Sequence, residues 1–186
     1  RKGVAKAMRH LYSKVPQEKL WPWFKRLFPA SLTMMILMVM LDSKLRVPGI
    51  APHGIVAIQF AKTPEEVERL LAAWGGETRP LLILSLLVDY LYMASYLAAD
   101  SLGCVLVGLK HPRLKQISVA FSWAVLLTAL MDATENAACL WAVFVHPTEL
   151  STGITWVAAT IKWTVGLSCL AFMAAGLLLP KAKVAR

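Results

Sequence analysis

The chain of 186 residues is 58% hydrophobic and 17% charged, with a mean hydropathy of +0.58. Soluble domains are about 45–50% apolar and about 25% charged, so this composition excludes an ordinary soluble protein and indicates an integral membrane protein. The net charge of +9 would suggest nucleic-acid binding in a soluble protein. Here eight basic residues precede the first apolar run and three follow the last, so we expect membrane lipids as partners and no nucleic acid.

The first apolar run, residues 28–41, is shorter than a spanning helix, which needs about 20 residues. It crosses the bilayer only if Trp21, Trp23 and Phe24 lie at one interface while the two basic residues that follow extend toward water. Its methionines are typical of a lipid-facing or helix-packing surface: Met34, Met35, Met38 and Met40.

Residues 42–80 form a connection with five basic and five acidic side chains. Within it, Thr63 is placed to cap a helix that has Pro64 at its first position and Glu66 three residues after the cap. We expect an outer-side amphipathic helix that lies along the membrane surface or caps the bundle; the alternative is a small extramembrane packing element. Its apolar face would consist of Val67, Leu70, Leu71 and Trp74.

Three further apolar runs are long enough to span a membrane: residues 81–109, 117–145 and 154–179. The first of them either ends near Ala99, because Asp100 interrupts it, or continues to Leu109.

The distribution of Lys and Arg orients these runs. Residues 110–115 hold three basic side chains and residues 146–153 hold none, which places the first connection inside and the second outside. Both chain ends are basic and therefore inside, which requires an even number of spans. We predict an all-α protein with four transmembrane helices and cytoplasmic N- and C-termini, in the bacterial cytoplasmic (inner) membrane. It would comprise a basic cytoplasmic or interfacial segment, a transmembrane domain and a basic cytoplasmic tail: residues 1–27, 28–180 and 181–186.

Ionisable side chains inside the long runs are informative, because each costs roughly 2.5–3.5 kcal/mol near a helix centre. With a rise of about 1.5 Å per residue, four of them lie about 12–20 Å from the outer boundary. These four are Asp89, Asp132, Glu135 and Lys162. Groups on three helices thus fall at similar depths, and we expect one intramembrane polar cluster.

The polar side chains form a stripe on each of the three helices. The stripes are Asp89, Tyr92, Met93, Tyr96 and Asp100; Thr128, Asp132, Glu135, Asn136 and Cys139; and Thr155, Ala159, Lys162, Gly166 and Cys169. Small residues spaced by four favour close helix contacts. They are Ala94 and Ala98, Ala120 and Ala124, Ala133 and Ala137, and Ala171 and Ala175.

Within the cluster, we expect Lys162 to pair with Glu135 or Asp89. Three carboxylates and one ammonium group leave a net charge of minus two, so at least one acid should carry a proton near neutral pH.

We also expect Asp132 to share a proton or a hydrogen bond with Asn136 or Tyr92. The cluster then has two interpretations. It is either functional, as a proton relay, an ion site or a polar ligand pocket, or it is an interhelical clamp that fixes helix register.

The sequence contains no complete catalytic motif and requires no cofactor, although it is compatible with lipid or pigment contacts. All four histidines lie outside the spans, and His111 and His146 are weak candidates for a chlorin or haem ligand at the interface. Cys104, Cys139 and Cys169 lie in apolar runs without a Cys-x-x-Cys pair, so we expect packing thiols and no metal site.

Two runs carry a family resemblance. Residues 88–96 contain an Asp-aromatic-x-aromatic pattern that starts at Asp89, and residues 131–136 contain an Asp-x-x-Glu-Asn pattern. Together with the Thr-Pro-Glu-Glu run at residues 63–66, they resemble a broad group of small bacterial four-helix integral membrane proteins of uncharacterised function. The resemblance covers residues 55–145 and implies the fold without implying an activity.

Two functions fit these observations. The first is a non-catalytic accessory or scaffold subunit of a larger energy-transducing or transport complex, docked through its basic N-terminus and its amphipathic outer segment. The second is a small membrane enzyme or transporter that acts on a lipid-like or ionic substrate through Asp89, Asp132, Glu135 and Lys162. We favour the first, because enzymes of this size usually bury histidine or metal-ligand groups, and the spans contain no histidine.

Overall fold

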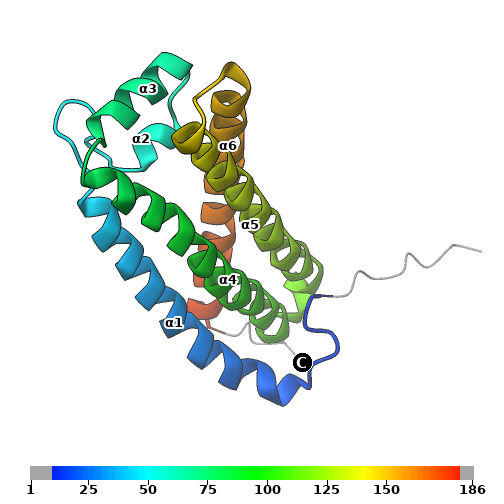
Figure 1. Ribbon diagram of the computed structural model, residues 1–186. Helices are drawn as coiled ribbons and strands as arrows, with labels where there is room; N and C mark the ends of the chain where they lie inside the picture. Colours follow the sequence, from blue (N-terminus) through cyan, green and yellow to red (C-terminus); the bar gives the residue numbers. More distant parts are fainter. Residues whose placement is uncertain (1–9, 181–186) are drawn as a thin grey trace, which may run out of the picture.

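The structure, a computed structural model, describes residues 10–180 (Figure 1). Its four long helices are α1 (Gln17–Ser43), α4 (Thr78–Lys110), α5 (Lys115–Phe144) and α6 (Glu149–Leu178). All four are long and apolar enough to cross a membrane, which confirms the prediction of an all-α integral membrane protein with four such helices. Seven of the basic residues used to orient the chain lie outside the described residues: Arg1, Lys2, Lys6, Arg9, Lys181, Lys183 and Arg186.

Two helices are longer than their apolar runs suggested. α1 begins at Gln17, well before the apolar run at residues 28–41. The aromatic residues assigned to the interface therefore belong to the helix itself. The predicted boundary between the N-terminal segment and the transmembrane domain, at residue 27, falls inside α1. α4 continues through Asp100 to Lys110, so the longer of its two predicted lengths is correct. One aspartate lowers helix propensity by less than about 1 kcal/mol, which is too little to end a helix that packs on three neighbours.

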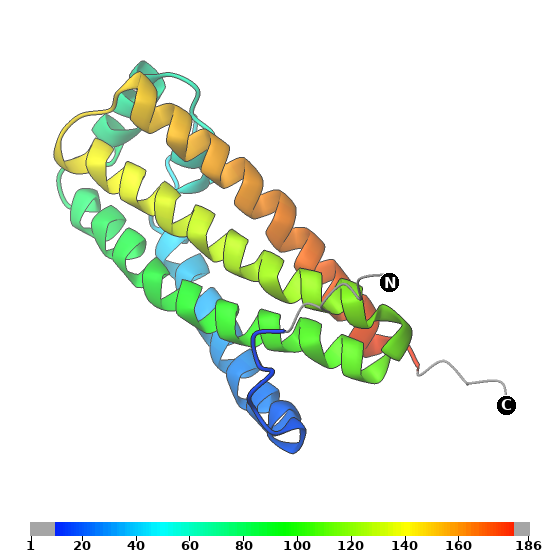
Figure 2. The ribbon, with the colours of Figure 1, turned by 90° about the vertical axis from the view of Figure 1, so that its right-hand side faces the viewer.

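The long helices run alternately up and down, and α4 is central: it packs against α1, α5 and α6, while α5 also packs against α6 (Figures 1 and 2). Helices α4 and α6 approach each other closely at two glycines. A Cβ atom on Gly176 of α6 would lie 2.4 Å from a methyl carbon of Val107 on α4, and one on Gly103 of α4 would lie 2.1 Å from the Met173 sulfur on α6. Of the eight alanines predicted for this role, Ala124 and Ala133 are half-buried and pack against a hydrophobic core, and none is fully buried.

Basic side chains from one helix satisfy the last carbonyl groups of another. At the end of α5, the guanidinium of Arg79 donates to the Val143 carbonyl at 2.5 Å. At the end of α6, the amine of Lys110 donates to the Leu177 carbonyl at 2.5 Å. The final carbonyls of a helix lack partners within the helix and lie at its negative end, so cations from α4 stabilise both ends.

The connection between α1 and α4 is packed and contains two short helices, α2 (Val56–Gln59) and α3 (Pro64–Ala73). The α3 helix starts as predicted, with the Glu66 amide donating to the Thr63 hydroxyl at 3.3 Å. Trp74 is fully buried and donates from its indole to the Leu45 carbonyl at 2.6 Å. The apolar face of α3 lies in one core with the end of α5: Val67, Leu70, Leu71, Ala142 and Val143.

Candidate functional site

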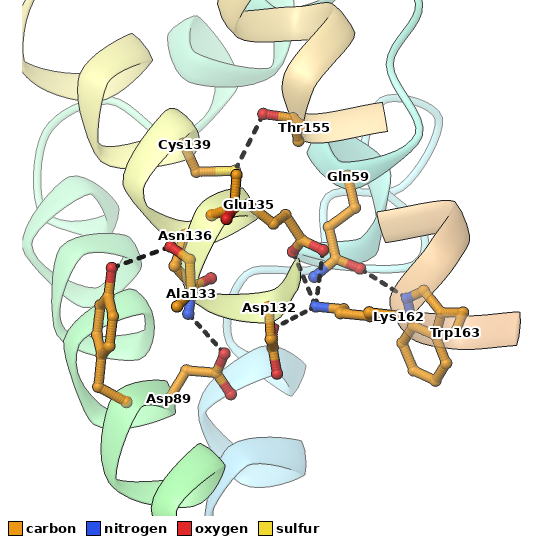
Figure 3. A network of polar contacts seen from close by, with 12 residues as sticks. Gln59, Asp89, Asp132, Ala133, Glu135, Asn136, Cys139, Thr155, Lys162 and Trp163 are labelled. Atoms are coloured by element: carbon orange, nitrogen blue, oxygen red, sulfur yellow. Dashed lines mark hydrogen bonds and ion pairs between the residues drawn. The ribbon is translucent and has the colours of Figure 1, made fainter. Parts of the chain in front are cut away.

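The predicted cluster is centred on the side-chain amine of Lys162 on α6 (Figure 3). Its Nζ atom donates to Oδ1 of Asp132 at 2.7 Å and to Oε1 of Glu135 at 2.9 Å, and lies 2.8 Å from Oε2 of Glu135. The two acids are three residues apart on α5, so one helical turn presents both to α6. Glu135 is fully buried, and Asp132 and Lys162 are only 4% and 9% exposed.

Two hydrogen bonds join this α5–α6 ion pair to α4. The Tyr96 hydroxyl donates to Oδ2 of Asp132 at 3.0 Å. The Asn136 amide donates to Oδ2 of Asp89 at 2.6 Å. Polar side chains of three spanning helices therefore meet at one level of the bundle, as their predicted depths required (Figure 3).

The individual partners agree with the predictions only in part. The expected pair of Lys162 and Glu135 is confirmed. The expected bond between Asp132 and Asn136 was wrong, because Asn136 bonds to Asp89 on α4 instead. Asp132 and Asn136 are one turn apart on α5, and each reaches across to another helix.

The tyrosine that bonds to Asp132 is Tyr96, and the alternative prediction of Tyr92 was also wrong. Tyr92 packs the edge of its ring on Tyr96, with 5.2 Å between the ring centres. One turn further along α4, Asp100 is half-buried and makes no hydrogen bond or ion pair with any residue between 10 and 180. In the predicted stripe on α4, Asp89 and Tyr96 thus bond to α5, whereas the Asp100 carboxyl group has no partner among residues 10–180.

A residue that the sequence analysis missed closes the cluster on one side. Gln59, in the short α2 helix, is 6% exposed and accepts a hydrogen bond from the indole of Trp163 at 3.1 Å. Trp163 follows Lys162, so α2 is fixed to α6 beside the ion pair (Figure 3). The only signal for Gln59 was that it is the single polar side chain in the apolar stretch 55–60.

The predicted stripes of α5 and α6 face each other beyond the charged groups. The Cys139 sulfur lies 4.0 Å from the Thr155 hydroxyl, and a Cβ atom on Gly166 would lie 3.1 Å from the Thr128 methyl group. The expected packing role of the cysteines agrees with their burial as free thiols: Cys104, Cys139 and Cys169.

The weak cofactor candidates lie apart from this cluster. The Nε2 atom of His111 lies 2.9 Å from the Gly176 carbonyl oxygen, where it helps to terminate α6. His146 is exposed in the connection between α5 and α6. Between residues 10 and 180, no group of three or more His, Cys, Asp or Glu side chains is arranged to hold a metal ion.

The side chains of the cluster supply carboxyl, amide, phenol and ammonium groups. Such groups can hold helices in register or exchange protons. No family model, curated protein or solved structure matches the chain.

Proposed function

We propose that this protein is a non-catalytic integral membrane subunit that packs into a larger energy-transducing or transport complex through α1. The observation that carries the proposal is the exposure of this helix. Only Leu20, Phe24 and Ser31 of α1 are buried, although it is long enough to cross the membrane. The rest of the helix presents a continuous apolar face: Leu32, Met35, Ile36, Leu37, Val39 and Met40.

The composition of that face favours a protein partner over lipid alone. Methionine is enriched in protein interfaces, where its flexible side chain adapts to irregular surfaces. Met35 and Met40 are 41% and 62% exposed, and Met34 and Met38 are half-buried beside them. At the N-terminal end of the helix, Trp21, Phe24 and Phe28 stack in series and would anchor it at the interface.

The polar cluster supports a structural role, because its charged side chains bind to one another and to neighbouring helices of the same chain. Asp132 and Glu135 are both paired with Lys162, and Asp89 accepts from Asn136. A membrane scaffold needs its helices held in one register while partners bind outside, and a buried ionic network between three helices provides this.

The proposed orientation places both termini in the cytoplasm of a bacterial inner membrane. The connection between α4 and α5, at residues 110–115, is basic, whereas the connection at residues 146–153 contains no basic residue. This difference favours an inner position for residues 110–115. The amphipathic helix α3 then lies on the outer side, at the opposite end of the bundle from the basic turn (Figure 1).

Site-specific photocrosslinking in the native membrane tests the docking face. A photoreactive residue replacing Ile36 on α1 should crosslink to one protein of defined mass. The matched controls are Leu130 on α5 and Leu167 on α6, which are exposed to a similar degree, at 55% and 57% against 57% for Ile36. If α1 is the docking face, the two control positions should crosslink to lipid only. Crosslinking to lipid at all three positions would exclude α1 as a docking face.

One observation favours a second candidate, a small transporter or enzyme for a lipid-like or ionic substrate. Asp100 lies inside α4 without a partner in the described chain, and Tyr92 and Tyr96 lie between it and Asp89 on the same helix. A line of hydroxyl and carboxyl groups can carry protons. Proton entry into proteoliposomes that contain the purified chain, abolished by Asp100→Asn, would establish this function; impermeable proteoliposomes would exclude proton transport by the chain alone.

A further inference from the structure

The inner end of the proposed topology contains a pocket that the proposed function does not use. It has a volume of about 350 Å³ and lies between the end of α6 and the turn that joins α4 to α5. That turn is a short 3-10 helix, η1 (Pro112–Leu114). The pocket walls are mainly apolar: Leu114, Phe172, Ala175, Leu179 and Pro180. The one polar ring in the wall, that of His111, is already directed at the Gly176 carbonyl.

Unpaired positive charge lies beside this pocket. Arg113 and Lys115 flank Leu114, are exposed, and form no ion pair between residues 10 and 180. Their neighbour Lys110 differs, because its amine is bonded to the end of α6. The sequence offers these two charges few counterions, since it contains no acidic residue between Asp100 and Asp132 and none after Glu149.

The start of α5 adds donors to the same place. The helix begins at Lys115, and the residue before it, Leu114, provides no side-chain cap. The Lys115 amide donates to the Pro112 carbonyl of η1, and the amides that follow it lie at the positive end of α5, which favours an anion. Cationic side chains and the positive end of a helix thus lie next to an apolar pocket, at the end of a bundle whose helices cross the membrane.

We propose that this pocket is a binding site for one anionic phospholipid. An acyl chain would occupy the space between Phe172, Ala175 and Leu179, and the phosphate group would lie over Arg113, Lys115 and the first amides of α5. Basic pockets between spanning helices on the cytoplasmic side bind anionic head groups, and the volume is at the lower end of the range for small-molecule sites. The inference does not depend on the proposed docking of α1.

Native mass spectrometry of the purified chain tests the site, with phosphatidylglycerol and phosphatidylcholine as probes. We expect one phosphatidylglycerol to bind with an affinity about 30-fold higher than that of phosphatidylcholine, since each basic residue near an anionic lipid contributes about fivefold. Replacing both charges, Arg113→Gln with Lys115→Gln, should remove this preference. The control pair Lys44→Gln with Lys62→Gln, exposed at the opposite end of the bundle, should retain it.

The apolar part of the site is tested separately. Ala175→Phe fills the pocket and should abolish high-affinity binding, whereas Ala174→Phe, the adjacent exposed residue that does not line the pocket, should have no effect. Equal binding of the two lipids, or equal loss in the control variants, would overturn the proposal. Complete displacement of the lipid by millimolar inorganic phosphate would also overturn it, because the site would then recognise an anion without an acyl chain.

Discussion

The Nζ atom of Lys162 on α6 lies 2.7 Å from Oδ1 of Asp132 on α5, and both side chains are buried. The same amine contacts Glu135, so two acids share one cation at the level where three helices meet. A buried ion pair adds little net stability compared with apolar residues, but losing one partner is costly. This asymmetry determines how the cluster should respond to substitution.

Lys162→Met should lower the free energy of unfolding by about 3–5 kcal/mol, because it leaves Asp132 and Glu135 buried without their cation. Unfolding in mixed micelles, followed by tryptophan fluorescence, measures the change. Adding Asp132→Asn and Glu135→Gln to Lys162→Met should restore most of the loss, since the two carboxyl groups that had faced the cation are then replaced by neutral amides. A single variant as stable as the wild type would show that the ion pair does not clamp the helices.

Asn136→Leu should lower the free energy of unfolding by about 1–2 kcal/mol, because Asp89 loses the amide that donates to it at 2.6 Å. The matched control is Thr134→Leu. Thr134 is exposed on the same helix, and its hydroxyl bonds only to the Leu130 carbonyl of its own helix. Equal losses in the two variants would mean that the α4–α5 hydrogen bond contributes nothing measurable.

Gly176→Ala should lower the free energy of unfolding by about 1–3 kcal/mol, because the new methyl group would overlap Val107. Gly153→Ala, in the first turns of the same helix, meets no atom within 4 Å and should raise it by up to about 1 kcal/mol through helix propensity. Combining Gly176→Ala with Val107→Ala should recover part of the loss. If Gly176→Ala instead stabilises the protein as Gly153→Ala does, the close contact between α4 and α6 does not exist.

The segment before α1 should dock less tightly on the bundle as the pH falls. Burial, and to a lesser extent the charge of Lys115, lower the pKa of His10 from its ordinary value of 6.5. The docked state therefore disfavours the protonated ring, so the contribution of His10 to docking is fully present above about pH 6.5 and is lost as the pH falls through the lowered pKa. The hydrogen-exchange protection of the peptide around Tyr12, whose hydroxyl bonds to the Ala98 carbonyl, should fall between pH 7.5 and 5 once each rate is divided by that of the unfolded chain at the same pH. In His10→Gln this protection should be independent of pH in the same range; an unchanged pH dependence would assign the effect to another group.

Much of the fold was predictable because apolar runs longer than about 20 residues have few alternatives to spanning helices. The extent of α1 was not predictable, because its first turns mix apolar and charged residues such as Trp21 and Lys25. In the structure these turns are helical, and they pack on the core through Leu20 and Phe24. The cap at Thr63 was predictable because it depends on residues three positions apart.

The composition of the site was predictable and its pairing was not. Helical spacing places Asp132, Glu135 and Asn136 on one face, whatever the neighbouring helices do. Which tyrosine reaches Asp132 depends on how α4 is rotated and shifted against α5, and these quantities have no local signal in the sequence. Gln59 was missed for the same reason, because its partner Trp163 is 104 residues away on another helix.

The most direct test of the proposed subunit role is the mass of the particle that contains this chain after gentle extraction of the native membrane. If the protein is such a subunit, the particle is a stoichiometric complex much larger than the 20.5 kDa chain, and it dissociates when Ile36 and Met40 on α1 are both replaced by alanine. The same replacements should leave the Lys162 cluster and the fold of the bundle intact. A particle near the mass of the chain alone would contradict the account and direct attention to Asp100 and the second candidate function.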